Sequence, residues 1–523
     1  MNHLQNNSII LLVKKNLSLI VAALPLLTFV IVAQIDLNLA KNITEIAKQF
    51  ALNRLGGIWL WMVISVFLVA IGLAISPIGS IKLGGEKSNP SLSIFEWCSV
   101  LICTLLAGGG VFWSAAEPLI HFLTPATYFS QYEGNTKSAI DQAFAVSFLH
   151  WGFLAWALVG STIAITFSLL SQKGFSLRPR SLLIPLSSEK FSNGLIGDLA
   201  DGLCVVAAIA GTVGPLGFLS LQLSNAAGRL TWVSDSLFLQ VGIVIGLTII
   251  FSISTVSGIQ RGIKLLSKLN IWLTIILAVS LILLGPTFWI LKHFVSSMGL
   301  YLKSFPMMSL PDQNDSWVQG WTIFYWGWFL GYAPLMGLFT AGISKGRSIR
   351  ELVIVVAIAC PLITNLWFMI LGGNGIYLEL DNPGLITSEF NAGGSAAVFF
   401  AILNNLPLSK LLIFVGLLLI ILFMSTSADS ISYAAAIVLS GEEVPPKKQR
   451  LFWAILIGLL TISLLRIGAD SSGQTSIDAL QSFIILTAIP VTPILLTTLY
   501  TAPLLAYKAY KNNLKKIKTT KDS

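Results

Sequence analysis

Aromatic side chains run through the middle of one apolar segment, residues 317–342, which reads WVQGWTIFYWGWFLGYAPLMGLFTAG. The segment holds four tryptophans and two tyrosines, and Gly327, Gly331 and Pro334 lie among them. Lipid-facing helices are built mainly from Leu, Ile and Val, with aromatic residues at their two ends. Aromatic faces attract cations, and interrupted helices at membrane depth form the sites of many transporters. The segment therefore predicts a pocket for an organic cation beside a broken helix.

A second aromatic pair, Trp151 and Trp156, lies in the segment HWGFLAWA at residues 150–157. Five residues at 100° each place the two side chains about 140° apart around a helix. They cannot line one wall together, but they can flank the entrance of a pocket. One interfacial tryptophan is ordinary in a membrane helix, whereas two beside a histidine favour a site.

Hydroxyl groups gather at Ser425, Thr426 and Ser427, close to Asp429, and Thr212 lies in another apolar segment. A sodium ion bound without water needs several oxygen ligands, which hydroxyls and freed carbonyls supply at little cost in charge. The alternative is that these hydroxyls bond back to the carbonyls of their own helices. The sequence leaves both interpretations open.

Few charged residues lie inside the apolar segments, and each one there needs a physical reason. Glu117 follows a run of glycines, and Asp429 follows the hydroxyl cluster. Each either partners a helix end or an arginine, or takes part in ion binding or gating. The four histidines have no haem or zinc spacing within a helix, and there is no P-loop, which argues against an enzyme or an ATP-driven pump; they are His3, His121, His150 and His293.

The composition is that of a multi-span membrane protein. Of 523 residues, 55% are hydrophobic and 11% are charged, and the mean hydropathy is +0.82. The apolar runs are long and lack a period of two, so we expect a helical bundle. The predicted twelve spans are 17–37, 57–77, 93–122, 138–169, 195–226, 236–256, 267–293, 317–342, 350–372, 408–438, 450–468 and 477–507.

Lys and Arg are divided unevenly between the two sides of this predicted bundle. With the N-terminus inside, 23 of the 32 lie on the inner side and nine on the outer side. This bias predicts that both termini are cytoplasmic, and it explains the net charge of +9 without nucleic acid. The four cysteines fall inside spans and predict neither a disulfide nor a metal site.

Spans three to seven and spans eight to twelve form two blocks of five. Because five is odd, the second block must run through the membrane in the opposite sense. Each block opens with a span that contains a glycine-rich break, at 107–110 in the first and at Gly327, Gly331 and Pro334 in the second. Paired breaks indicate a central transport site, although glycines also occur where helices pack closely. The predicted organisation is an N-terminal part with two peripheral spans (1–92), a first repeat (93–295), an interfacial amphipathic linker (296–316), a second repeat (317–507) and a basic tail (508–523).

Six segments, in one order along the chain, resemble the betaine/carnitine/choline transporter (BCCT) family between about residues 57 and 468. The eighth span of that family reads approximately WTxFYWxWWxxWxPFxG. The matching segments here are GGGVFWSAAEPL at 108–119, HWGFLAWA at 150–157, SGIQRGIKLLSKLN at 257–270, WTIFYWGWFLGYAPLMG at 321–337, FTAGISKGRSIRE at 339–351 and TSADS at 426–430.

The resemblance implies an all-α integral membrane protein of twelve helices, with the inverted repeats of the amino-acid–sodium symporter type, usually a homotrimer. Members move trimethylammonium compounds or related zwitterions by sodium symport, proton symport or exchange. The family's aromatic box draws on Trp151, Trp156 and the eighth span. In sodium-coupled members Thr212 and the pair Thr426 and Ser427 look like ligands.

The chain departs from the family pattern at informative positions. Val159 stands where a tyrosine is common, Phe329 replaces the second tryptophan of the WW pair, and Tyr332 replaces the next one. Phenylalanine attracts a cation less strongly than tryptophan, which predicts a wider pocket or a less strongly cationic solute. Ala208 replaces a threonine of one sodium position, so we expect one retained sodium site and a degraded second one.

These observations predict a secondary active transporter of the cytoplasmic (inner) membrane that imports glycine betaine, choline or a similar compatible solute by sodium symport. Alternatives are a sodium-independent exchanger, a carrier of carnitine or ectoine and, more distantly, a channel or a membrane-embedded enzyme. No cofactor is expected besides sodium as coupling ion, and the expected partners are the solute and the lipid bilayer. The predicted substrate-binding residues are Trp151, Trp156, Trp326, Trp328 and Phe329 around the quaternary head, with Phe112 and Tyr332 along the way; the predicted sodium ligands are Thr212, Thr426 and Ser427.

Overall fold

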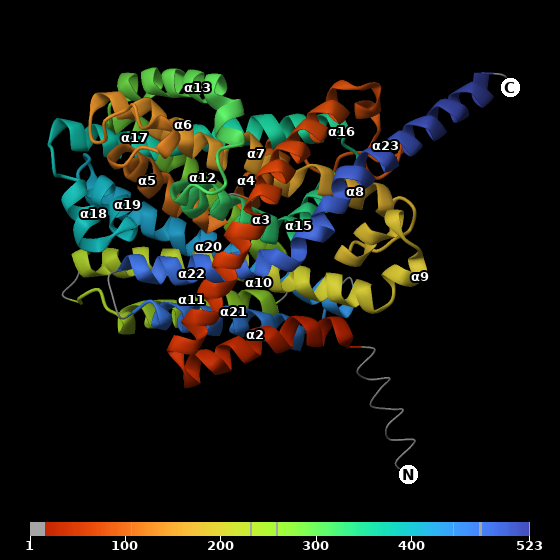
Figure 1. The fold of residues 1–523 in the computed structure, drawn as a ribbon, viewed down its shortest axis with the longest axis horizontal. Coiled ribbons are helices and arrows are strands. Elements are labelled where there is room, and N and C mark those ends of the chain that lie inside the picture. Colours follow the sequence, from red (N-terminus) through yellow and green to blue (C-terminus); the bar gives the residue numbers. More distant parts are fainter. Residues whose placement is uncertain are drawn as a thin grey trace, which may run out of the picture.

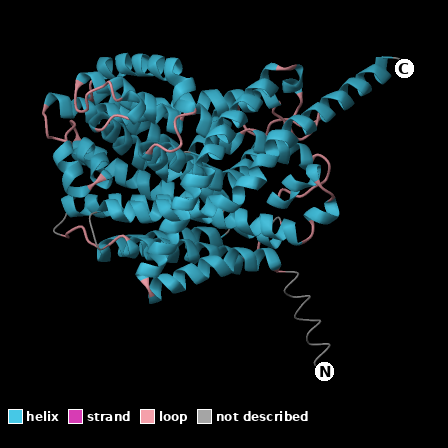
Figure 2. Cartoon of the chain, in the orientation of Figure 1, coloured by secondary structure: helices cyan, strands magenta, loops and turns pink. Residues whose placement is uncertain are grey.

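The chain is helical throughout the part that the computed structural model describes, residues 16–105, 107–230, 233–257, 260–442, 444–469 and 473–521 (Figures 1 and 2). Extended pairing within these ranges is limited to one bridge, between Lys82 and Ser348. The prediction of an all-α membrane protein is therefore confirmed. Lys14 and Lys15 of the inner-side count, and Gly258 and Ile259 of the 257–270 segment, lie outside the described residues.

Nine described helical stretches are long and apolar enough to cross a membrane, or up to eleven if each of two bent pairs counts as one span. The predicted count of twelve and the inverted repeats stay predictions. The nine are α2 (Leu17–Ile35), α3 (Leu37–Ile75), Lys137–Ser171 with α6 (Ile140–Trp151), α7 (Phe153–Gly160) and α8 (Thr162–Ser171), α10 (Leu195–Leu230), α11 (Leu237–Ser257), Ile349–Asp381 with α16 (Ile349–Ile354), η6 (Val355–Ala359) and α17 (Cys360–Asp381), α20 (Ser409–Ser440), α21 (Lys447–Ile467), and Ser476–Lys515 within α22 (Gly473–Ala488), η7 (Ile489–Val491) and α23 (Thr492–Lys521).

The expected eighth span is helical from end to end, through α14 (Ser316–Val318), η5 (Gln319–Ile323) and α15 (Phe324–Ile343). It falls outside the nine because tryptophan, tyrosine and glycine take the place of aliphatic side chains. The predicted break at Gly327, Gly331 and Pro334 is wrong, since α15 continues through all three residues. A Cβ on Gly327 would lie 2.6 Å from the Trp59 ring, so this glycine serves close packing. The irregular turn lies earlier, in the π-helical η5.

The third span is bent where the glycine run begins. Ile94–Thr104 of α4 (Ile94–Leu105) and Gly109–Leu123 of α5 (Ala107–Leu123) meet at 70°. The predicted break at 107–110 thus coincides with a real change of direction.

The fourth span contains a break that its sequence does not predict. Gly152 separates α6 from α7 with φ −100° and ψ −137°. A Cβ at this position would lie 2.1 Å from the carbonyl oxygen of Phe148. Only glycine allows the chain to pass so close to the preceding turn.

The seventh span ends sooner than predicted. α12 (Gln260–Leu284) stops at Leu284, and α13 (Thr287–Ser309) turns away by 107°. α13 includes the amphipathic stretch expected near 295–310 and lies along the upper edge of the molecule in Figure 1. Asp141 holds α13 against the start of α6, because its Oδ1 lies 2.8 Å from His293 Nδ1 and from Ser296 Oγ.

α10 is the central helix of the packing, and it contacts α2, α15, α20 and α22. Near its first turns, Asp198 and Asp201 bind two arginines at the start of η4 (Pro179–Leu186). Arg180 Nη2 lies 2.5 Å from Asp198 and Arg178 Nη2 lies 2.7 Å from Asp201. These ion pairs fix the start of α10, and α5, α6, α15 and α17 surround the site described next.

Candidate functional site

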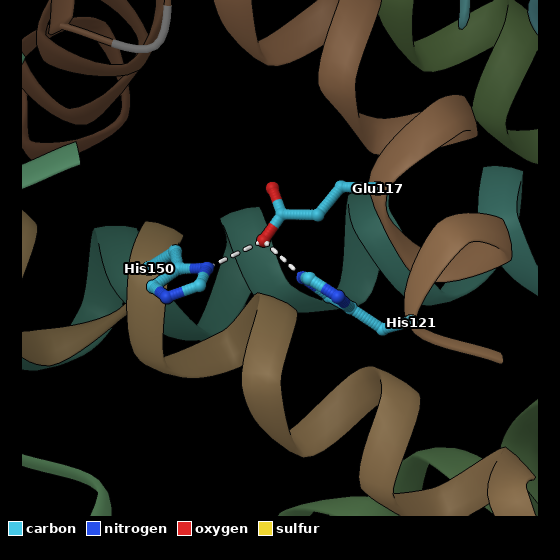
Figure 3. A group of neighbouring side chains, drawn as sticks. All are labelled: Glu117, His121 and His150. Atoms are coloured by element: carbon cyan, nitrogen blue, oxygen red, sulfur yellow. Dashed lines mark hydrogen bonds and ion pairs between the residues drawn. The ribbon is translucent and has the colours of Figure 1, made fainter. Parts of the chain in front are cut away.

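Glu117 lies at the centre of a buried hydrogen-bond network that joins α5, α6 and α15. Its Oε1 lies 2.7 Å from His150 Nδ1 and 3.3 Å from His121 Nε2. Figure 3 shows both imidazole rings pointing toward this oxygen. Its Oε2 accepts hydrogen bonds from Trp151 Nε1 at 2.7 Å and from the Tyr325 hydroxyl at 2.6 Å. None of these five side chains is more than 3% exposed.

The chemistry of the donors assigns the roles in this network. An indole N–H can only donate, so Glu117 Oε2 is an acceptor. An ionised carboxylate has no proton to donate, so His150 Nδ1 donates to Oε1, and His150 Nε2 lies 3.0 Å from the Thr322 hydroxyl, which can donate or accept. Of the two alternatives for Glu117, a helix end or an arginine as partner does not occur among the described residues, and a part in ion binding or gating stays a prediction. The partners are two histidines, a tryptophan and a tyrosine.

The same atoms form a possible metal-ligand set. Glu117 Oε1, His121 Nε2 and His150 Nδ1 lie within 4.8 Å of one another. The expectation from the sequence concerned spacing within one helix, and it does not apply to this group, because His121 and His150 come from α5 and α6. Imidazole and carboxylate suit zinc or iron, but these atoms already pair with one another at hydrogen-bond distances. The arrangement fits a hydrogen-bonded network around a carboxylate.

Trp151 also stands at the centre of a cluster of aromatic rings. Its ring centroid lies 5.4 Å from Phe329, 5.9 Å from Trp328 and 5.4 Å from Tyr325, all on α15. Phe368 of α17 approaches from another helix at 5.2 Å. Three of the predicted site residues, Trp151, Trp328 and Phe329, thus lie together. We call these five rings the aromatic cluster.

Phe112 joins the aromatic cluster indirectly. It stacks on Phe218 of α10 at 5.1 Å, and Phe218 lies 5.9 Å from Trp328. Gly109 makes the approach of α5 possible, because a Cβ there would lie 2.5 Å from the Trp328 ring and 3.4 Å from the Trp151 ring. The glycine run of span three therefore lets two indoles pack directly against the helix backbone.

The other three predicted substrate residues lie outside the aromatic cluster. Trp156 is buried but contacts no other aromatic ring in the described part of the chain. Trp326 lies 6.2 Å from the His150 ring, and its indole N–H has no hydrogen-bond partner among the described residues. Tyr332 packs over Gly211, whose carbonyl accepts from Trp328 Nε1 at 3.3 Å.

Four contributors to this region were not identified as site residues. Tyr325 was within the aromatic segment, and His121 follows Glu117 by one helical turn, so both carried a signal in the sequence. Phe218 and Phe368 come from helices distant in sequence and carried none.

The predicted sodium ligands lie on α10 and α20, which pack against each other. Thr212 Oγ1 donates to the Ala208 carbonyl at 2.9 Å, and Thr426 Oγ1 donates to the Leu422 carbonyl at 2.8 Å. Bonding of hydroxyls to their own helix, the alternative interpretation, thus occurs at both threonines. A hydroxyl that donates in this way still presents its lone pairs to a cation. Ser427 Oγ is buried without a partner among the described residues.

Asp429 bonds to a hydroxyl of a neighbouring helix, and Arg450 of α21 lies near enough to act on its charge. Its Oδ2 accepts a hydrogen bond from Ser254 of α11 at 2.6 Å. This bond connects α11 to α20 close to Thr426 and Ser427.

Comparison with known proteins supports the resemblance noted from the motifs. The chain is 39% identical over 485 residues to glycine betaine transporter 2 of Vibrio parahaemolyticus, covering 92% of this chain and 88% of that protein. A probable glycine betaine transporter of Desulfitobacterium hafniense is 34% identical over 470 residues, which are 88% of this chain and 92% of the relative. An ectoine/hydroxyectoine transporter of Virgibacillus pantothenticus is 33% identical over 483 residues, 91% of this chain and 93% of the relative.

The family comparison covers nearly the whole described chain. The model of the betaine/carnitine/choline family of transporters matches residues 18–511, which include α5, α6, α15, α17 and both candidate sodium helices. The helices, the aromatic cluster and the relatives agree on a membrane transporter rather than an enzyme. The chain belongs to the betaine/carnitine/choline transporter (BCCT) family.

Proposed function

We propose that this transporter imports a quaternary-ammonium or betaine-type compatible solute, such as glycine betaine or choline, by sodium symport. The observation that carries the proposal is the aromatic cluster packed against the Glu117 network. A quaternary ammonium group has no N–H to donate, so aromatic faces and a nearby negative charge are the protein groups that attract it.

Glu117 strengthens the case for a cationic ligand. A carboxylate that accepts hydrogen bonds from the Trp151 indole and the Tyr325 phenol polarises both groups and makes their ring faces more negative. The carboxylate also contributes its own field, which water screens little at a buried position. Two rings of the aromatic cluster are thereby prepared for a cation.

Phe329 limits which solutes fit the proposed site. Phenylalanine at this wall favours a solute whose positive charge is spread out, and a relative named as an ectoine/hydroxyectoine transporter supports ectoine as the second candidate. Carnitine and a sodium-independent exchange mode are further alternatives.

Sodium coupling rests on Thr212, Thr426 and Ser427, whose hydroxyl oxygens lie on two packed helices. We further propose a homotrimer in the cytoplasmic membrane with both termini in the cytoplasm. The excess of Lys and Arg on one side of the spans supports this orientation.

Uptake into proteoliposomes tests the proposal. Labelled glycine betaine, choline, carnitine and ectoine are supplied with an inward sodium gradient, and with potassium in its place as control. We expect saturable uptake of glycine betaine or choline that requires sodium. Uptake that ignores sodium rejects the symport, and failure of every onium compound to enter or compete rejects the aromatic-cluster site.

A further inference from the structure

The break at Gly152 exposes backbone donors next to the aromatic cluster. α6 ends at Trp151 and α7 begins at Phe153, directly after the glycine. The N–H groups of the first turn of any helix, here of Phe153, Leu154 and Ala155, have no acceptor within that helix. They also carry the positive end of the helix dipole, which favours an anionic group.

Asn365 of α17 faces this break with its side-chain amide. Its side chain is fully buried, and neither its Nδ2 nor its Oδ1 has a hydrogen-bond partner among the described residues. Nδ2 lies 3.2 Å from the point where a Cβ of Gly152 would be. Leaving a buried amide unpaired costs free energy, so a group that pairs with it at some stage of the transport cycle accounts for its presence.

Other polar side chains of the same helix make at least one hydrogen bond within the protein, although Asn374 Oδ1 also lacks a partner among the described residues. Thr364, the preceding residue, donates its hydroxyl to the Cys360 carbonyl at 3.0 Å. Asn374 donates its amide to the Ile370 carbonyl at 2.7 Å. Asn365 therefore differs from its neighbours in having neither amide atom engaged.

The break and Asn365 adjoin the aromatic cluster on two elements. Trp151 immediately precedes Gly152, and Phe368 lies one helical turn after Asn365 on α17. The rings of Trp151 and Phe368 are 5.2 Å apart. Glu117 engages the indole N–H of the same Trp151, so a carboxylate and a set of neutral donors both border this ring.

We infer that the first turn of α7 and Asn365 form the subsite for the carboxylate of a zwitterionic solute, whose cationic end lies in the aromatic cluster. The inference rests on the proposed function and extends it to the anionic half of the substrate. The Phe153 amide already faces the Tyr301 hydroxyl. Asn365 Nδ2 and the amides of Leu154 and Ala155 therefore donate to the carboxylate oxygens. All of these donors are neutral. When the carboxylate leaves, no unpaired charge stays buried in the protein, so release avoids that cost in free energy.

Glycine betaine and choline test this inference, because they share a trimethylammonium head and only betaine has a carboxylate. Kd is measured for both by the change in tryptophan fluorescence of the purified protein. In N365D the side chain keeps its shape but carries a negative charge, which repels a carboxylate. In N365L the hydrogen-bond donor is lost. T364V is the matched control, since its hydroxyl bonds only to its own helix. Size-exclusion profiles and Tm verify folding.

We expect N365D and N365L to raise the Kd of glycine betaine about tenfold or more, while the Kd of choline changes less than twofold in N365L and does not rise in N365D, whose added negative charge attracts the cation. T364V leaves both values unchanged. A ratio of the two Kd values that stays at the wild-type level in folded N365D and N365L overturns the inference, and so does a change confined to the sodium dependence, which marks a cation site. Wild-type protein that binds neither compound rejects the proposed function itself.

Discussion

Glu117 and Trp151 are joined by a hydrogen bond of 2.7 Å between carboxylate Oε2 and the indole N–H, although both side chains are buried. A bond to an ionised acceptor is roughly twice as strong as one between neutral groups. It fixes the orientation of the ring at the centre of the aromatic cluster. Because Tyr325 donates to the same oxygen, one carboxylate sets the positions of rings from both α6 and α15.

Replacing this carboxylate tests its role in holding the rings. In E117Q one end of the side chain becomes an NH₂ group, which faces donors and cannot accept from them. We expect a lower Tm and a Kd for choline raised about tenfold, in line with the loss of a charge-assisted hydrogen bond. Tryptophan fluorescence titration gives the Kd. E133Q, at an exposed loop residue, is the control, and a Kd in E117Q equal to that of E133Q contradicts the role.

Gly109 tests whether the glycine run of span three serves ring packing. A methyl group there would lie 2.5 Å from the Trp328 ring, and the neighbouring Trp151 ring at 3.4 Å leaves little room to move. We expect G109A to displace the indoles and reduce uptake more than tenfold, because overpacking forces side chains out of their positions. G246A in α11 is the matched control, since a methyl group there meets nothing within 4 Å. Equal uptake by the two variants would mean that α5 or the indoles shift to accommodate the methyl group, and would contradict a role of Gly109 in ring packing.

The sequence predicts the helical class and the principal aromatic residues because hydropathy and residue type are local properties. Trp151, Trp328 and Phe329 are predicted from two separate segments, and their rings lie together in the structure. The break in span four cannot be predicted from the sequence, because nothing local distinguishes Gly152 from other glycines. Only the structure shows that a Cβ at this position would lie 2.1 Å from the Phe148 carbonyl oxygen. In span eight the opposite error occurred, since Gly327 and Gly331 are positions of helix packing within a continuous α15.

The Glu117 network could be predicted only in part. His121 lies one turn from Glu117, which is a local signal, whereas His150 and Tyr325 reach the carboxylate from helices 33 and 208 residues away in sequence. Such pairings depend on how α5, α6 and α15 pack. Phe218 and Phe368 enter the region in the same way, so spacing along the chain carries no information about them.

The two tryptophans of span four should differ in their effect. Trp151 contacts three rings of α15, whereas Trp156 contacts no other ring in the described part of the chain. A cation–π contact away from water is worth about 2 kcal/mol, or roughly 30-fold in affinity. We therefore expect W151L to raise the KM for choline uptake about 30-fold and W156L to raise it less than threefold. W151F, which keeps a ring, should lie between W151L and wild type. A larger effect of W156L than of W151L would contradict this assignment and would indicate that the cation binds beside α7.

Sodium coupling can be tested separately from solute binding at Thr426. Its hydroxyl donates to the Leu422 carbonyl at 2.8 Å and leaves its lone pairs for an ion. We expect T426A to raise the sodium concentration that gives half-maximal uptake about tenfold, because one oxygen ligand is lost, while the Kd for choline measured at saturating sodium changes little. T212A should act in the same direction, less strongly if its sodium position is degraded. S432A on the same helix is the control, since its hydroxyl bonds to the Ala428 carbonyl at 2.7 Å and is assigned no ion. An equal sodium requirement in T426A and S432A would remove Thr426 from the ion site.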